Sequence, residues 1–98
     1  MNSYKDSHGN SIPKNVIDRR VRLAKQEKLN EQINEHGYHF CEHCGISSGT
    51  YLDCSHDISV NDCQMNGNCE LAYDVNNITI LCRICHENHH NDKTRNNN

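Results

Sequence analysis

The sequence is poor in the residues that build a large apolar core. Among its 98 residues there is no Trp, one Phe and one Pro, and only 34% of the residues are apolar. A chain this short and polar buries too little apolar surface to be stable by burial alone, and it can form at most one domain. Long hydrophobic runs are absent as well, since no stretch approaches the roughly 20 apolar residues of a membrane helix.

The start of the chain also lacks the apolar run of a secretory signal, so we expect a cytoplasmic protein with no membrane partner. In a reducing compartment, clustered cysteines bind metal or do chemistry more often than they form disulfides. The count of seven cysteines is odd, which argues against a fully paired disulfide framework. These cysteines and the eight histidines make metal binding the first source of stability to consider.

Two C-x-x-C pairs predict a structural zinc site. Cys41 and Cys44 form the first pair, and Cys82 and Cys85 form the second. Each pair can place two thiolates on one ion, and two pairs complete a tetrahedron with Zn–S distances of about 2.3 Å. A structural Zn²⁺ ion can contribute on the order of 10 kcal/mol of apparent binding energy, which is comparable with the whole stability of a small domain.

The other cysteines, and a histidine inside the first pair, receive different predictions. We expect Cys54 to pack as a small apolar side chain on a strand, and Cys63 and Cys69 to be free thiols in a loop. A second metal site built on Cys63 and Cys69 is the alternative. His43 lies between Cys41 and Cys44, where intervening side chains point away from the ion, so we expect no ligand role for it.

The chain divides into four segments. We expect a flexible arm over residues 1–12, a basic helix over 13–37, a zinc-containing domain over 38–92 and a disordered tail over 93–98. The helix begins near the one proline, and Gly37 stands where a helix stop is expected. Its apolar stripe is weak, so we expect the helix to lean on the domain without forming its core.

Short strands are predicted within the zinc-containing domain, over residues 51–55 and 77–81. A long connection, residues 57–76, joins them, and a short helix is expected over 83–92. A loop this long in a small domain is more often functional than idle. The fold class that follows is a small α+β domain held together by zinc.

The net charge of −3 conceals a division along the chain. Residues 1–40 carry seven Lys and Arg against five Asp and Glu, residues 41–90 carry one against seven, and residues 91–98 carry two against one. A bound polyanion must therefore find most of its counter-charge on the flanks. The helix cations form either a solvated face or a surface that contacts phosphates. The candidate DNA-binding residues are Arg19, Arg20, Arg22, Lys25 and, inside the acidic segment, Arg83.

The zinc pairs are embedded in three longer segments: CEHCG (41–45), LDCSHDIS (52–59) and NITILCRICHENHH (77–90). Together these segments resemble the HNH family of metal-dependent nucleases, in the subgroup with two C-x-x-C pairs. The resemblance implies a ββα-metal (His-Me finger) core preceded by the N-terminal basic helix, DNA as the substrate and a catalytic divalent ion beside the structural Zn²⁺. It also implies 5′-phosphate and 3′-hydroxyl products. Chains of this type occur in phage genomes, so a phage or its bacterial host cell is the implied setting.

The resemblance gives three residues a catalytic role. His56 is the general base, because neutral imidazole accepts a proton near pH 7. His86 is a ligand of the catalytic metal. Asn77 is expected to hydrogen-bond the backbone of the connection between the strands and so to hold His56 in place. An asparagine that merely favours a turn before a strand is the alternative for Asn77.

Helical spacing indicates the second ligand of the catalytic metal. In a helix His86 points about 100° away from Cys85, so one helix can face zinc on one side and a second metal on the other. His90 follows His86 by four residues and shares its face, which is also the H-x-x-x-H spacing of colicin-type HNH nucleases. His89 is the alternative ligand. The metal itself can be Mg²⁺, Mn²⁺, Ni²⁺ or Zn²⁺.

Ser55 departs from the family pattern. Many members have Asp immediately before the catalytic histidine, where it binds the metal, and a hydroxyl is a poor ligand for a hard cation. Three outcomes are open. His90 can complete the site, Asp57 or another loop carboxylate can substitute with Ser55 assisting, or the site can be too weak for efficient cleavage.

The leading hypothesis is a small HNH endonuclease that nicks or cuts DNA. One site serves one strand, so cutting both strands requires a homodimer or two visits. The alternative is a non-catalytic zinc module that binds DNA or a protein partner and keeps a degraded HNH site. A redox or metal-storage protein that uses the surplus cysteines is a third hypothesis.

Overall fold

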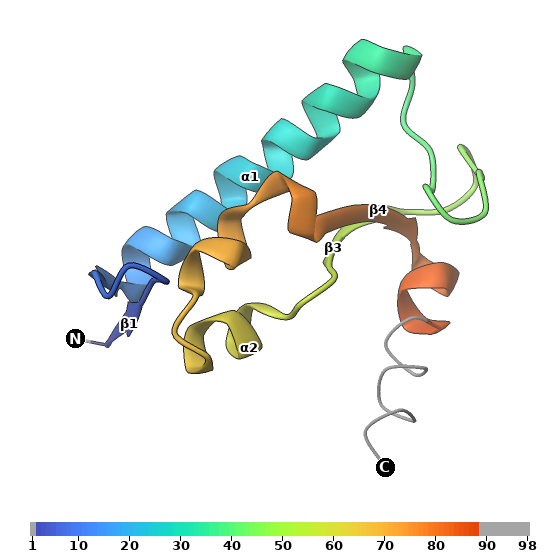
Figure 1. Ribbon diagram of the computed structural model, residues 1–98. Helices are drawn as coiled ribbons and strands as arrows, with labels where there is room; N and C mark the ends of the chain where they lie inside the picture. Colours follow the sequence, from blue (N-terminus) through green and yellow to red (C-terminus); the bar gives the residue numbers. More distant parts are fainter. Residues whose placement is uncertain (1, 89–98) are drawn as a thin grey trace.

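The longest element of the protein is the helix α1 (Lys14–His36), and the other elements lie along one side of it (Figure 1). The computed structural model describes residues 2–88. Proline before the helix and glycine after it set its limits, as the sequence predicts: Pro13 is extended, with ψ 144°, and Gly37 has φ 81°. The left-handed backbone of Gly37 lets its N–H donate to the carbonyl oxygen of Ile33, 2.8 Å away.

One face of α1 belongs to the main apolar core. Ile17 is fully buried and Val21 is 9% exposed, and both lie in a cluster with Cys63, Cys69 and Ala72. The expectation that this helix stays outside the core is wrong. The stripe of apolar residues is narrow, but the chain between the predicted strands folds against it and supplies the missing partner surface.

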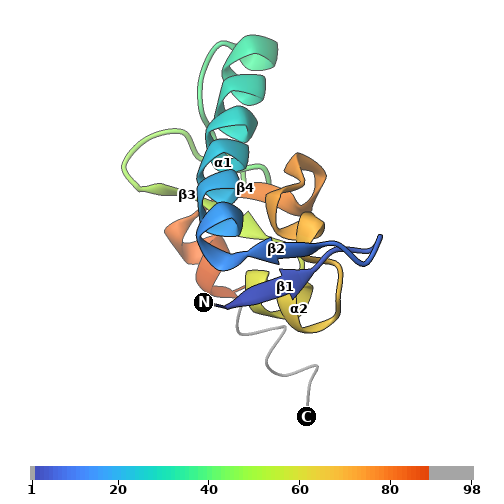
Figure 2. The same cartoon turned by 90° about the vertical axis from the view of Figure 1, so that its left-hand side faces the viewer.

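The expectation of a flexible arm over residues 1–12 is also wrong. The strands β1 (Ser3–Lys5) and β2 (Ser11–Pro13) form an antiparallel hairpin that leads directly into α1 (Figure 2). Tyr4 and Ile12 are opposite each other in the hairpin, and both pack against the main core. This apolar pair is too short to be recognised in sequence, and it orders the arm because a core surface lies beneath it.

The connection between the predicted strands is not a loop. It folds into one short α-helix and two short 3₁₀ helices: α2 (Val60–Met65), η1 (Cys69–Tyr73) and η2 (Val75–Asn77). Cys63 and Cys69, expected as free loop thiols, have no exposed surface and pack in the main core. Burial raises the pKa of both thiols above the usual value, so they stay neutral as small apolar side chains.

The second sheet consists of β3 (Leu52–His56) and β4 (Ile78–Cys82), which pair antiparallel with His56 opposite Ile78. Both strands lie within one residue of the predicted ranges. The chain then turns into a helix at residues 83–88. The protein is therefore a small α+β domain, as predicted, with two short sheets arranged along one long helix.

Some predictions concern positions beyond residue 88. The end of the helix expected over 83–92 and the tail 93–98 lie outside the described residues. Within residues 2–88, no helix combines the length and the apolar character needed to cross a membrane.

A buried glutamine connects the end of α1 to the segment that enters the zinc site. Gln32 is 5% exposed, and its Nε2 donates to the carbonyl oxygen of Phe40 at 2.9 Å. Its Oε1 accepts from the backbone N–H of Phe40 at 3.1 Å. The amide thus pairs with both backbone groups of one residue, as a neighbouring strand would. This contact fixes where the chain turns back from the helix.

Replacing this glutamine is expected to destabilise the fold. Gln32→Ala leaves the N–H and C=O of Phe40 without their partners, so the free energy of unfolding should fall by about 1–3 kcal/mol. Denaturant unfolding of the zinc-loaded protein measures this. The control is Gln26→Ala, since Gln26 bonds only an exposed neighbour, Asn30, in the described contacts. Equal stability of the two variants would contradict the role of Gln32.

Candidate functional site

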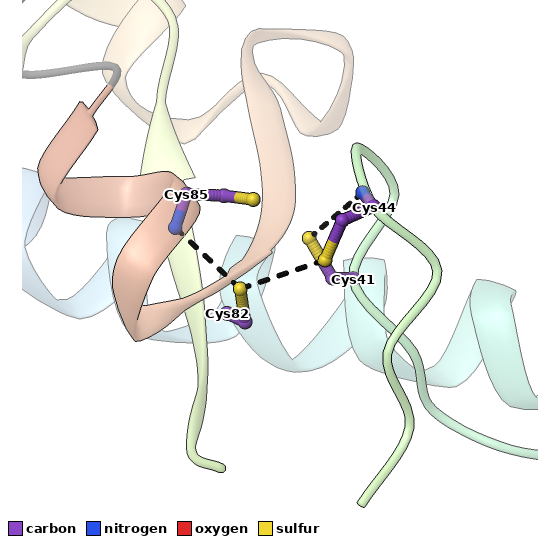
Figure 3. A group of neighbouring side chains, drawn as sticks. All are labelled: Cys41, Cys44, Cys82 and Cys85. Carbon is purple, nitrogen blue, oxygen red and sulfur yellow. Dashed lines mark hydrogen bonds between the residues drawn. The ribbon is translucent and has the colours of Figure 1, made fainter.

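The four cysteines of the two C-x-x-C pairs meet at one point between the first knuckle and the end of β4 (Figure 3). Their sulfur atoms all lie within 4.8 Å of one another. The Sγ atoms of Cys44 and Cys82 are 3.7 Å apart. A tetrahedron with Zn–S bonds of 2.3 Å has edges of about 3.8 Å, so the cluster is close to the size that a structural zinc ion requires.

Each knuckle points a backbone N–H at its own first sulfur. The N–H of Cys44 donates to Cys41 Sγ at 3.4 Å, and the N–H of Cys85 donates to Cys82 Sγ at 3.5 Å. The first knuckle closes when Gly45, at φ 83°, donates its N–H to the carbonyl oxygen of Cys41 at 2.9 Å. These donors stabilise negative charge on the sulfurs, as metal-binding thiolates require.

The thiol pKa values show why a cation is needed there. Burial raises the pKa of Cys41, but backbone N–H donors, chiefly those of Cys44 and Cys82, lower it to about 6. Burial and the neighbouring sulfurs raise the pKa of Cys85 to about 12. A thiolate at Cys41 therefore opposes ionisation of Cys85, and a bound divalent ion would allow all four cysteines to bind as thiolates.

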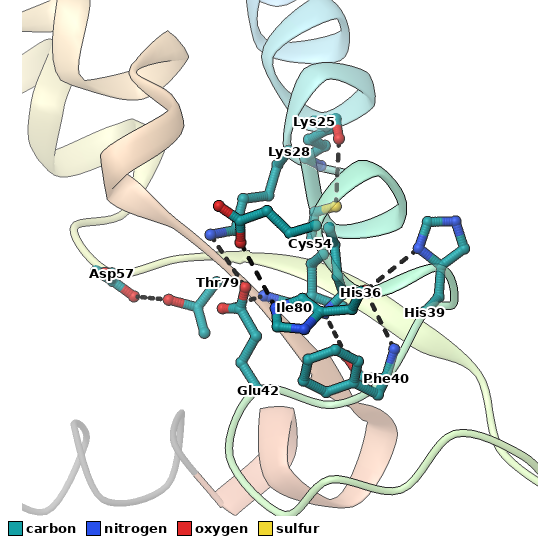
Figure 4. A network of polar contacts seen from close by, with 12 residues as sticks. Lys25, Lys28, His36, His39, Phe40, Glu42, Cys54, Asp57, Thr79 and Ile80 are labelled. Atoms are coloured by element: carbon teal, nitrogen blue, oxygen red, sulfur yellow. Dashed lines mark hydrogen bonds and ion pairs between the residues drawn. The ribbon is translucent and has the colours of Figure 1, made fainter. Parts of the chain in front are cut away.

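The first knuckle is also tied to the sheet and to α1. The N–H of Glu42 donates to the carbonyl oxygen of Ile80 at 2.8 Å, and its carboxylate accepts from the N–H of Ile80 at 3.2 Å. The other carboxylate oxygen lies 3.0 Å from Lys28 Nζ of α1 (Figure 4). The zinc site is therefore held against the outer edge of β4.

His56, the candidate base, is the last residue of β3, and one of its ring nitrogens is hydrogen-bonded. Its Nε2 lies 2.8 Å from the carbonyl oxygen of Ala72 in η1. A carbonyl only accepts, so Nε2 carries the proton and Nδ1 of the neutral ring keeps its lone pair. Burial lowers the pKa of His56, the bond to Ala72 opposes this, and the charge of Lys25 lowers it further. The ring is therefore neutral, and able to accept a proton, at pH 7.

Asn77 makes the backbone contacts that its sequence position predicts. Its Oδ1 accepts from the N–H of Ile58 at 2.8 Å, and its Nδ2 donates to the carbonyl oxygens of Ile58 and Leu71 at 3.0 and 2.9 Å. Its own carbonyl oxygen accepts from the N–H of Asp57 at 2.8 Å. Asn77 thus joins the chain just after His56 to the connection that carries Ala72.

His86, the candidate metal ligand, lies next to a carboxylate that the sequence analysis did not single out. His86 Nδ1 is 3.3 Å from Asp53 Oδ2, and Arg83 Nε donates to the same oxygen at 3.0 Å. Burial raises the pKa of Asp53, but the hydrogen bonds from His86 and Arg83 outweigh this and lower it. The sequence does contain a sign of this role for Asp53. Side chains of a strand alternate between its faces, so Asp53, two residues before Ser55, lies on the same face of β3 as Ser55.

The two residues proposed to replace the missing aspartate are not at this position. Ser55 is 4% exposed and lies within the sheet, opposite Thr79. Asp57 accepts from the hydroxyl of Thr79 at 2.9 Å, four residues along the chain from Asp53. The carboxylate that the structure places beside His86 is therefore Asp53.

The candidate base and the candidate metal ligand lie on opposite faces of β3. Successive side chains of a strand alternate between faces, so Asp53 and His56 point in opposite directions. His56 contacts Ala72 of η1, whereas Asp53 contacts His86. His89 and His90, the two candidates for a further ligand, lie outside the described residues.

The candidate DNA-binding cations of α1 do not form one stripe. Arg20 donates to the hydroxyl of Tyr73 at 3.2 Å, and its guanidinium lies 5.2 Å from the centre of that ring. Arg19 and Arg22 are exposed and about 60° apart around the helix. Lys25 is partly buried above β3, where its carbonyl oxygen lies 3.7 Å from Cys54 Sγ. Cys54 is thus packed between the sheet and α1.

No protein family, curated protein or solved structure matches the chain. Within residues 2–88, the four cysteines are the one group of three or more side chains close enough to hold a metal ion. The feature that the described residues show is therefore a four-cysteine cluster that could hold a metal such as zinc.

Loss of one zinc ligand is expected to remove the metal and unfold the domain. Cys82→Ser should lower the zinc content from one ion per chain to nearly none, because a hydroxyl stays protonated and binds Zn²⁺ poorly. Metal analysis and circular dichroism after gel filtration measure this. Cys54→Ser makes the same exchange outside the metal site, and it should keep one zinc ion per chain. Full zinc occupancy in Cys82→Ser would contradict the assignment.

Proposed function

We propose that the protein is a metal-dependent endonuclease that hydrolyses DNA phosphodiester bonds, with a ββα-metal core formed by β3, β4 and the helix that begins at residue 83. The observation that carries the proposal is the state of His56, which is anchored through Nε2 and keeps a lone pair on Nδ1. The resemblance of the surrounding segments to HNH nucleases supports it. Phosphodiester hydrolysis requires such a base, together with a cation near the departing oxygen.

His56 acts on the attacking water. Nδ1 accepts a proton while the water oxygen forms a bond to phosphorus and the bond from phosphorus to the 3′ oxygen breaks. The products are a 5′-phosphate and a 3′-hydroxyl, which takes its proton from solvent. The ring becomes positively charged during the step, and this strengthens the hydrogen bond from Nε2 to the carbonyl of Ala72. Asn77 keeps the turn after His56 in place.

Asp53 and His86 are the ligands that we assign to the catalytic divalent ion. Their 3.3 Å separation fits one ion, since two adjacent octahedral ligands at about 2.1 Å from a metal are about 3 Å apart. Asp53 supplies the carboxylate that Ser55 lacks, and His90 is the further ligand we propose from its helical spacing. When bound, the ion supplies positive charge to the phosphate and to the departing oxygen.

The open edge of β3 is where both groups can reach one phosphate. In the described part of the chain, β3 pairs only with β4, so its other edge has no strand partner. His56 leaves one face of the strand and Asp53 the other. A strand is narrow, since neighbouring strands lie only about 5 Å apart. Side chains from both faces of β3 can therefore reach a phosphate that lies along its edge. We therefore place the scissile bond beside β3.

Cations on two elements can hold the DNA around this edge. Arg83 bonds Asp53, and a metal on that carboxylate would free the guanidinium to contact a phosphate. Lys25 influences the pKa of His56 and so lies on the side of the base. Arg19 and Arg22 offer two further exposed charges on α1. One site cuts one strand, so cleavage of the second strand requires a second copy of the chain or a second binding event.

Removing the base should abolish cleavage. His56→Ala is expected to lower metal-dependent nicking of supercoiled plasmid by at least about 100-fold, because no other group accepts the water proton. The assay uses zinc-loaded protein with a panel of added divalent metals. His8→Ala, which changes an exposed histidine in the hairpin turn, is the control and should nick like the wild type.

Two results would contradict this assignment. The first is nicking by His56→Ala at the wild-type rate with normal zinc content. The second concerns pH. Because the pKa of His56 is lowered from 6.5, the base form is complete at neutral pH, and the rate should level off below pH 7. A rate that keeps rising above pH 7 would point to another base.

Removing the carboxylate should weaken the catalytic metal site. Asp53→Asn keeps the shape of the side chain but loses its charge, so the metal concentration for half-maximal nicking should rise by about 10-fold or more. Titration of Mn²⁺ or Mg²⁺ in the plasmid assay measures this. Asp62→Asn neutralises an exposed carboxylate of α2 and serves as the control. Unchanged metal dependence of Asp53→Asn would exclude Asp53 as a ligand.

A non-catalytic zinc module that binds DNA or a protein is the second candidate. It is favoured by one observation, the ion pair that already engages Asp53 with Arg83 at 3.0 Å. Calorimetry on the zinc-loaded protein separates the two candidates. A nuclease should bind a second divalent ion with loss of that signal in Asp53→Asn, whereas a degraded site should bind none.

A further inference from the structure

A histidine of the first knuckle touches a zinc-binding cysteine of the second. His43 Nδ1 lies 3.4 Å from Cys85 Sγ, and the two residues are 42 positions apart in the sequence. This differs from the expectation that His43 points away from the metal site. The turn of the first knuckle directs the imidazole across the gap, so that it meets the ligand on the opposite side.

The zinc site determines which group donates in this contact. A zinc-bound cysteine has no proton, so Cys85 Sγ can only accept a hydrogen bond. His43 must then donate through Nδ1–H. Cys41 and Cys82 accept from the backbone N–H groups of Cys44 and Cys85, whereas the donor described for Cys85 is a side chain. A substitution can remove a side-chain donor, whereas it leaves a backbone donor in place.

The corner formed by His43 and Cys85 borders an open cleft of about 330 Å³. The cleft lies between the first knuckle, the face of the sheet and the last described helical turn. Its lining also includes Leu81, Thr79, Asp57, Glu42 and Asn88. Cys41, by contrast, is completely buried. Of the other ligands, Cys44 is exposed, Cys85 is partly buried and Cys82 is buried. Solvent and reagents therefore reach the zinc site at Cys44 and, through the cleft, at Cys85, where His43 stands beside the sulfur.

The charge around this corner makes a donor important. Four thiolates on one Zn²⁺ leave a net charge of about −2, and Asp57 adds a carboxylate to the cleft, whereas the carboxylate of Glu42 is paired with Lys28. Negative charge raises the tendency of a thiolate to take up a proton or attack an electrophile and so to leave the metal. An N–H bond to the sulfur draws electron density away and opposes both reactions.

We propose that His43 is part of the zinc centre, as the hydrogen-bond donor that keeps Cys85 on the metal at the side open to the cleft. The residue does not bind zinc itself while all four cysteines do. Partners of this kind change metal affinity by about 10-fold to 100-fold when they are removed. The proposal concerns the structural zinc only and does not depend on nuclease activity.

Two substitutions of similar size separate the hydrogen bond from packing. His43→Gln keeps an N–H donor, whereas His43→Leu fills the same space without one. We expect His43→Leu to lose zinc affinity by about 10-fold to 100-fold in competition with a chromophoric chelator, and His43→Gln to stay closer to the wild type. His8→Ala provides the control. All proteins are the full chain, loaded with zinc and checked by circular dichroism.

A second measurement follows the cysteines themselves. Limited alkylation of the zinc-loaded proteins with iodoacetamide, followed by peptide mass spectrometry, gives the modification rate of Cys85, with the exposed Cys44 as the internal reference. The rate should be higher in His43→Leu than in His43→Gln. The proposal is overturned if both variants retain zinc as His8→Ala does, or if both lose it equally, because the donor would then not be what matters. It is also overturned if Cys85, relative to Cys44, is modified no faster in His43→Leu than in His43→Gln.

Discussion

Four thiolates can share a space of 4.8 Å only around a cation, and the arrangement of the second half of the chain depends on this constraint. The apolar cluster at the zinc site is small: among the described residues, Leu52 and Leu81 are its non-cysteine members. Burial on that scale contributes little to holding two knuckles and a sheet together, and a metal ion bound by the four cysteines would supply the missing stability. The Glu42 contacts to β4 then align the sheet with the zinc site.

The first half of the chain is organised differently. The hairpin, α1 and the connection between the strands meet in the main core around Ile17, which contains no metal-ligand cysteine. The sheet of β3 and β4 runs between this core and the zinc site. His56 takes its position from the core side through Ala72, whereas His86 is placed by its neighbour Cys85 on the zinc side. The candidate active site is thus a junction between an apolar core and a metal-supported one.

Predictions from sequence succeeded where a short segment contains its own signal. The meeting of Cys41 and Cys82 was predictable, because each C-x-x-C pair forms a knuckle from neighbouring residues and two such pairs together supply the four ligands of one ion. Asn77 contacts the backbone of the connection between the strands, as the resemblance of its segment implies. Predictions failed where the partner lies far away. The sequence predicts a loop thiol at Cys63, because nothing near it in sequence reveals the face of α1 that packs against it.

The sequence by itself determined the zinc site, the limits of α1 and the two strands of the second sheet, since these depend on residue spacing, on proline and glycine, and on alternation over a few residues. Only the tertiary structure decided that the N-terminal arm is a hairpin, that Asp53 is the carboxylate beside His86, and that His43 faces Cys85. Each of these is a meeting of segments that the chain brings together only after it folds. Local propensity fixes what each segment can form, and packing between distant segments fixes which side chains meet.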